Sequence, residues 1–84
     1  MTTILYFAWV REAVGMAEER VAIPASVATV ADLIDWLGTR SAGHAAAFED
    51  RERLRVAIDQ VFVAPDASVL QAREIAIFPP VTGG

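Results

Sequence analysis

The last seven residues of the chain, FPPVTGG, carry the groups best suited to chemistry. Pro79 and Pro80 restrict the backbone toward an extended form, so the segment loses little conformational entropy when it binds. Gly83 and Gly84 have no Cβ atom and can pass through a channel too narrow for any other residue. Such a segment is suited to delivering the Gly84 carboxylate into the buried site of another protein.

The Gly84 carboxylate needs activation before it can react, because a C-terminal carboxylate is ionised at neutral pH and is a poor acyl donor. Its simplest activated form is a mixed anhydride with AMP, from which an amine, a hydroxyl or a sulfur nucleophile takes the acyl group. The sequence contains no G-x-x-x-x-G-K-[ST] phosphate-binding loop and no evident metal cluster. We therefore expect a separate enzyme to use ATP for this activation, and we expect no metal or cofactor on this chain.

Composition narrows the classes of partner. The formal net charge of -4 argues against nucleic acid, which requires a clustered basic surface. No apolar run approaches the roughly 18 residues of a membrane span, and the N-terminus lacks the basic flank of a secretory signal, so we expect a cytoplasmic protein without a membrane partner. The absence of cysteine excludes disulfides and thiolate nucleophiles within the chain. His44, in an alanine-rich run, is predicted to lie on the surface.

The elements that would position the tail begin with an apolar strand over residues 2–10, TTILYFAWV. Both of its faces are apolar, so one of them needs a cover other than the core. One face carries Ile4, Tyr6 and Ala8, and the other carries Leu5, Phe7 and Trp9. Residues 10–15 are predicted to form a short helical turn or loop ending at Gly15, and residues 19–23 a second strand.

The clearest helix signal covers residues 30–39. Thr29 and Asp32 have the spacing of a capping box, in which each side chain binds a free backbone N–H at the start of the helix. An apolar stripe with helical spacing follows, made of Val30, Leu33, Ile34 and Leu37. Residues 41–48 are predicted to form a short helix or an ordered loop anchored by Phe48.

Three strands are predicted in the second half, over residues 54–59, 61–63 and 74–78. In the first of them, Leu54, Val56 and Ile58 face inward, and Arg55, Ala57 and Asp59 face outward. Asp59-Gln60 is predicted to be a tight connection and Pro65-Asp66-Ala67 a turn. This order predicts an α+β fold, with a mixed sheet of about five strands and one main helix packed across it.

We expect residues 1–78 to form one two-layer domain and residues 79–84 to form an extended tail. In such a domain the helix covers one face of the sheet, and the other face is left without a helix. The alternation of residues places Leu5, Phe7, Ala57, Phe62, Ala76 and Phe78 on this face. Three phenylalanines on an open face predict a protein partner, unless a loop or the 41–48 segment folds over them.

The segments ILYFAWVREAVG (4–15) and EIAIFPPVTGG (74–84) resemble the end motifs of the molybdopterin synthase small subunit, the MoaD-type sulfur carriers. The resemblance implies a ubiquitin-like β-grasp fold. It also implies an E1-like adenylating enzyme that activates the terminal glycine and a sulfurtransferase that helps convert it to a thiocarboxylate. The charged tail would insert into the large subunit of a heterotetrameric molybdopterin synthase and donate sulfur to cyclic pyranopterin monophosphate.

Carried over by position, the resemblance makes Gly84 the thiocarboxylate and Gly83 the residue that gives clearance. Partner-binding positions are then Phe7, Arg11, Phe62, Phe78, Pro79, Pro80, Val81 and Thr82, although Arg11 also suits an ordinary surface position. Two scaffold positions depart from the family pattern. A Gly-Asp-Glu turn is replaced by Gln71-Ala72-Arg73-Glu74, which predicts a changed turn if alanine has a positive φ, and an Asn-Gln pair is replaced by Asp59-Gln60.

Three alternatives stay open at the level of sequence. The chain could carry sulfur for thiamine thiazole or cysteine synthesis, because that chemistry differs only in the acceptor. It could be a protein modifier that is joined through Gly84 to lysines of its targets. It could also be a plain interaction domain whose tail is incidental.

Overall fold

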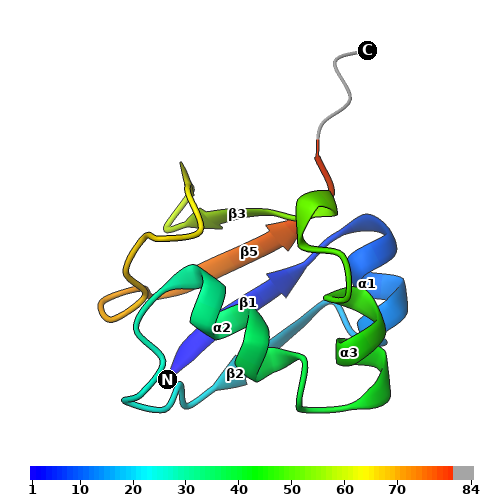
Figure 1. The fold of residues 1–84 in the computed structure, drawn as a ribbon, viewed down its shortest axis with the longest axis horizontal. Helices are drawn as coiled ribbons and strands as arrows, with labels where there is room; N and C mark the ends of the chain where they lie inside the picture. Colours follow the sequence, from blue (N-terminus) through cyan, green and yellow to red (C-terminus); the bar gives the residue numbers. More distant parts are fainter. Residues whose placement is uncertain (81–84) are drawn as a thin grey trace.

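The computed structural model describes residues 1–80, which form a five-stranded mixed sheet with three α-helices and one short 3₁₀ helix (Figure 1). The strand order is β2-β1-β5-β3-β4. Central strands β1 and β5 are parallel, and the other neighbours are antiparallel. This is the predicted α+β β-grasp arrangement. The elements are β1 (Thr2–Tyr6), α1 (Ala8–Val14), β2 (Glu18–Val21), α2 (Val30–Leu37), α3 (Ala42–Ala47), η1 (Arg51–Arg53), β3 (Arg55–Ile58), β4 (Val61–Val63) and β5 (Glu74–Phe78).

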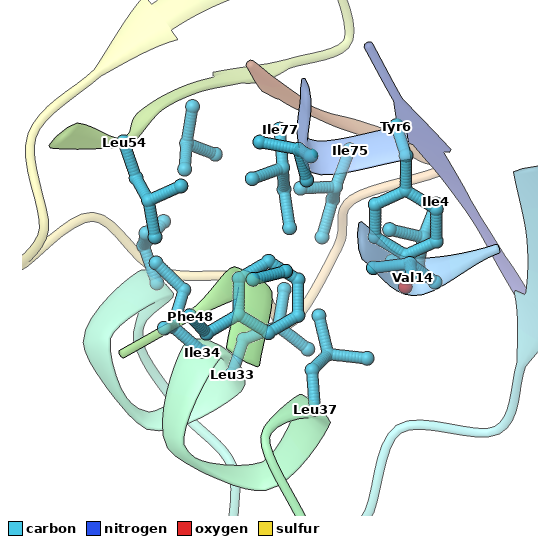
Figure 2. Close-up of a cluster of buried hydrophobic side chains, with 14 of the residues drawn as sticks. Ile4, Tyr6, Val14, Leu33, Ile34, Leu37, Phe48, Leu54, Ile75 and Ile77 are labelled. Atoms are coloured by element: carbon cyan, nitrogen blue, oxygen red, sulfur yellow. The ribbon is translucent and has the colours of Figure 1, made fainter. Parts of the chain in front are cut away.

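The core lies between the sheet and α2, as Figure 2 shows. Every second residue of the two central strands points into it, which is the period expected for a sheet with one covered face. The fully buried residues of β1 and β5 are Ile4, Tyr6, Ile75 and Ile77. The predicted apolar stripe of α2 packs against them, with Leu33 and Leu37 at zero exposure.

Helix α2 begins with the predicted capping box. The Asp32 N–H donates to Thr29 Oγ1, and Asp32 Oδ2 accepts from the Thr29 N–H, each at 3.2 Å. Backbone hydrogen bonds from Ala28 and Thr29 hold the pKa of Asp32 below its ordinary value. The helix ends at Leu37, slightly earlier than predicted. In residues 1–80 no helix has the length and apolarity needed to cross a membrane.

The first strand is shorter than predicted. β1 ends at Tyr6, and Ala8 has a φ of 52°, which turns the chain directly into α1. Val10 and Val14 of α1 enter the core. Trp9 therefore lies on a helix and not on the sheet, with the Arg53 guanidinium carbon 4.9 Å from its ring centroid. The predicted strand over 2–10 is confirmed for residues 2–6 and was wrong for residues 7–10, because an apolar run without glycine or proline hides this turn.

The prediction of a surface position for His44 was also wrong, since this residue is 4% exposed. Its Nε2 atom lies 2.7 Å from Glu19 Oε2, and its Nδ1 atom lies 2.7 Å from the hydroxyl of Ser41, which also caps α3. An ionised carboxylate only accepts hydrogen bonds, so Nε2 carries a proton. Glu19 also accepts from the Tyr6 hydroxyl at 2.7 Å and from Arg40 at 3.1 Å. This polar cluster joins α3 to strands β1 and β2.

Two turns complete the scaffold. Asp59 and Gln60 connect β3 to β4 as the predicted tight turn, with φ values of 48° and 73°. Asp59 Oδ1 accepts from the Glu74 N–H at 2.9 Å, which joins this turn to the start of β5. Ala72 does not have a positive φ, so the alanine found in place of the family's glycine introduces no backbone strain.

Candidate partner-binding site

An aromatic patch made of Phe7, Phe62 and Phe78 lies on the sheet face opposite α2. The register places Phe62 beside Ala57, and Ala57 beside Ala76 of β5. Phe78 lies two residues further along β5 on the same face, and its ring centroid is 5.5 Å from that of Phe62. Phe7 follows β1, and its N–H donates to the Ile77 carbonyl at 3.2 Å. Pleat alternation thus places on one face an aromatic residue from β4, one from the end of β5 and one that directly follows β1.

The patch is open in the part of the chain that the structure describes. Phe62 is 75% exposed and Phe7 is 45% exposed, although aromatic side chains gain much from burial. Phe78 is half-buried, as are Leu5 and Ala76. Ala57 is an exception to the predicted exposed face, because this small residue lies between Phe62 and Ala76 and is buried.

The 41–48 segment does not cover the aromatic patch. It forms α3, as predicted for a short helix, and Phe48 packs into the core on the other side of the sheet (Figure 2). Gly43 allows α3 to approach α1 closely, because a Cβ atom there would lie 2.4 Å from the Ala13 carbonyl oxygen. The alternative that this segment shields the phenylalanines is therefore wrong.

The patch lies where the C-terminal segment leaves the sheet. β5 ends at Phe78, and Pro79 and Pro80 follow with half-buried side chains. The other predicted tail residues, Val81, Thr82, Gly83 and Gly84, lie outside the described residues. Arg11 is exposed on α1, where its N–H donates to the Phe7 carbonyl at 3.3 Å. A partner that contacts Phe7 thus meets Arg11 one helical turn away.

Arg55 belongs to the same face but was not among the predicted site residues. It pairs with Phe78 across the sheet and is exposed. Its Nη1 atom donates to the carbonyls of Glu52 and Leu54 at 3.0 and 2.8 Å. Alternation does place Arg55 outward, but only the strand register puts it beside Phe78.

Polar side chains of the described residues are the candidates for a metal-binding or histidine-centred site. Among residues 1–80 there is no group of three or more histidine and acidic side chains positioned to hold a metal ion. His44, the histidine of the chain, is buried and hydrogen-bonded on both ring nitrogens. The exposed rings of the aromatic patch, with Arg11 and Arg55 at its margin, can present an apolar surface to another protein.

Comparisons with known proteins agree with this architecture. The model of the ThiS family matches residues 4–84. The molybdopterin synthase sulfur carrier subunit of Escherichia coli is 40% identical over 84 residues, covering all of both chains. The Haemophilus influenzae protein of the same name is 34% identical, also over both full lengths.

Solved structures share the fold over nearly the whole chain. A Pyrococcus furiosus protein, provisionally described as molybdopterin converting factor subunit 1, has a TM-score of 0.76 at 27% identity, over 95% of this chain and 97% of that one. SAMP1 of Haloferax volcanii has a TM-score of 0.71 at 28% identity, over 99% and 98%. The chain therefore belongs to the ThiS family, and its full-length relatives place it among the molybdopterin synthase sulfur carrier subunits.

Proposed function

We propose that this chain carries sulfur on Gly84 as a thiocarboxylate and donates it to cyclic pyranopterin monophosphate within molybdopterin synthase. A separate adenylating enzyme activates the tail with ATP, and a sulfurtransferase supplies the sulfur. The protein then acts in the cytoplasm as the small subunit of a heterotetramer and is not an enzyme alone.

The position of the aromatic patch at the base of the C-terminal segment is the observation that carries this proposal. Phe78 is the last residue of β5, and Pro79 and Pro80 follow it at once. A partner that buries Phe62 and Phe78 is therefore held beside the tail. Docking converts delivery of Gly84 into a step within one complex, which raises the effective concentration of the reacting group.

The chemistry of the tail follows from its carboxylate. A Gly84 oxygen attacks the α-phosphorus of ATP, which forms an acyl adenylate and releases pyrophosphate. A persulfide of the sulfurtransferase then attacks the acyl carbon and displaces AMP, which gives an acyl disulfide between Gly84 and the sulfurtransferase. A thiol reductant supplies two electrons to cleave this S–S bond, which frees the thiocarboxylate and the thiol of the sulfurtransferase. Gly83 keeps the tail narrow enough to enter the partner's site.

Intact mass measurement tests the carrier chemistry most directly. The protein is incubated with ATP, with the adenylating enzyme and with the sulfur-loaded sulfurtransferase from the same organism. We expect a mass increase equal to the replacement of one oxygen by sulfur, and no increase when ATP is omitted. The charged protein plus the large subunit should then convert cyclic pyranopterin monophosphate. Turnover only in a thiazole-forming or cysteine-forming system would assign the carrier to that pathway instead.

A second candidate, protein modification, is favoured by one observation. The Haloferax volcanii relatives of known structure include small archaeal modifier protein 1, with a TM-score of 0.68 at 26% identity. If this chain were a modifier, cell extracts would contain adducts of higher mass that disappear when Gly83 and Gly84 are deleted. This chain has no lysine, so it cannot itself accept an isopeptide bond on a side chain.

A further inference from the structure

Two hollows meet at Arg55, at the end of the sheet from which the C-terminal segment leaves. The smaller one, of about 190 Å³, lies beside Phe62 and Phe78 of the aromatic patch. The larger one, of about 460 Å³, lies between α2 and strands β3 and β4. Both are lined by Arg55, Val56 and Val63, so the two hollows adjoin at the end of the β3–β4 hairpin that lies opposite the Asp59-Gln60 turn. Together they are called the groove.

The larger hollow is mostly apolar. Its lining includes Val30 and Ile34 of α2, Leu54 and Val56 at the start of β3, and Val63 and Pro65 at the end of β4. β4 is an edge strand, so in residues 1–80 no further strand covers its outer side. Apolar side chains of an extended segment fit such a groove, which combines an open edge with pockets on either side.

The charge at the junction defines the partner further. Arg51 at the margin of the groove is already paired with Asp35. Arg55 forms no ion pair with a carboxylate of residues 1–80, whereas its Nη1 atom is held in place by two backbone carbonyls. A held guanidinium loses little further entropy when it binds, and its remaining N–H groups match a carboxylate.

We propose that this groove binds an extended segment of the synthase large subunit, with an aspartate or glutamate on Arg55 and apolar side chains in the two hollows. The inference rests on the proposed function, because it takes the large subunit as the partner. It extends the docking surface from the aromatic patch around the sheet edge to α2. Arg55 then acts as a specificity residue for the complex and takes no part in sulfur transfer.

Titration calorimetry with the purified large subunit tests this. We expect Arg55→Ala to raise the Kd about tenfold and to weaken its dependence on salt, as for an arginine anchor in an interface. Arg55→Lys should lose less affinity than Arg55→Ala, because lysine keeps the positive charge. It should still bind more weakly than the wild type, because it lacks the planar guanidinium that pairs with a carboxylate. Arg20→Ala is the matched control, since Arg20 is an exposed arginine on edge strand β2 at the opposite side of the sheet. Its Kd should equal that of the wild type.

A second variant tests the larger hollow separately. Ala64 is exposed and lines the groove, so Ala64→Trp should fill it, raise the Kd about tenfold and leave the melting temperature unchanged. Hydrogen exchange of the wild-type complex should show protection of residues 61–65. If the wild type binds the large subunit and both Arg55→Ala and Ala64→Trp bind with the same Kd, the groove is not a binding site, whereas the proposed function is unaffected. Failure of the wild type to bind the large subunit would overturn both.

Discussion

The two faces of the sheet are built from the same five strands but have opposite relations to solvent. On the face toward α2, Ile75 and Ile77 of β5 have zero exposure. On the other face, their neighbours Ala76 and Phe78 are half-buried, and Phe62 is 75% exposed. Both faces are apolar, so hydrophobicity alone does not decide which one is core. The covered face stabilises the fold, and the open face remains for association.

The largest expected effect on function without an effect on the fold comes from deleting the end of the chain. Deletion of Gly83 and Gly84 should abolish sulfur transfer, because no acyl group then reaches the partner's site. The melting temperature should stay the same, since the buried residues of the described chain end at Ile77. Activity of the synthase and thermal unfolding measure the two effects. A loss of several kcal/mol in the free energy of unfolding would contradict the separation of tail and core.

Ile77→Ala changes the covered face. We expect a loss of about 2–5 kcal/mol in the free energy of unfolding, because Ile77 is fully buried and its truncation leaves a cavity. Denaturant unfolding measures this loss. At denaturant concentrations near the midpoint of unfolding, the amount of variant bound to the large subunit should be proportional to the folded fraction. A loss below about 1 kcal/mol would mean that the core collapses around the cavity.

Phe78→Ala changes the adjacent residue on the open face. We expect affinity for the large subunit to fall by about 1–3 kcal/mol, as for an aromatic anchor. The free energy of unfolding should fall less than in Ile77→Ala, because Phe78 is only half-buried. Calorimetric binding and denaturant unfolding of the two variants form a matched pair. An unchanged Kd would place Phe78 outside the interface.

Gly43→Ala tests whether the close approach of α3 to α1 contributes to the stability of the fold. An added Cβ would lie 2.4 Å from the Ala13 carbonyl oxygen, so the helices must separate. We expect a loss of about 1–3 kcal/mol in stability, as for an overpacked core site. Ala45→Gly, at an exposed position of the same helix, is the control for helix propensity and should cost about 1 kcal/mol. A neutral Gly43→Ala would show that α3 shifts freely.

The smallest expected effect concerns Glu19 and pH. Burial raises the pKa of Glu19, but hydrogen bonds from His44 and Tyr6 and the charge of Arg40 outweigh it and hold the pKa below the ordinary 4.5. A depressed carboxylate pKa stabilises the fold above the unfolded-state pKa, and this contribution is lost as pH falls through the folded-state pKa. At pH 7 the free energy of unfolding of the wild type should exceed that of Glu19→Gln by about 1–2 kcal/mol.

Unfolding measurements from pH 7 downward check the sign of this effect. The difference between wild type and Glu19→Gln should stay constant to about pH 5 and shrink below the ordinary pKa of 4.5. A difference that grows on acidification would exclude the ionised carboxylate as the stabilising form. Burial and the hydrogen bond to Glu19 also raise the pKa of Tyr6, so this phenol stays protonated as the donor throughout.

Local patterns predicted those parts of the fold that depend on neighbours in sequence. The capping box of Thr29 and Asp32, the apolar stripe of α2 and the Asp59-Gln60 turn all appear as predicted, because each depends on residues within a few positions. Alternation along β5 also predicted its buried face. The strand prediction failed beyond Tyr6, because Ala8 turns the chain through a positive φ that no glycine marks. The predicted helical turn ending at Gly15 is present as the end of α1.

Long-range partners account for the other misses. His44 is buried because Glu19, 25 residues away, supplies a carboxylate at its Nε2 atom, and no local pattern reports such a partner. Arg55 joined the partner-binding site only through its register with Phe78 on β5. The packing of α3 on α1 likewise joins Gly43 to Ala13, two residues that are distant in the sequence.

Residue types and their spacing suffice to predict the order of the five strands and the main helix and the apolar character of both sheet faces, and they lead us to expect an extended FPPVTGG ending. Those properties reside in residue types and in periods of two and about 3.6 residues. Only the folded molecule shows that α2 and α3 cover the same face, that the rings of Phe62 and Phe78 meet at the base of the C-terminal segment and that Arg55 lies between two apolar hollows. Strand register and helix packing join residues far apart in the chain, so alternation can assign Phe62 and Phe78 to one face but cannot show that they are neighbours.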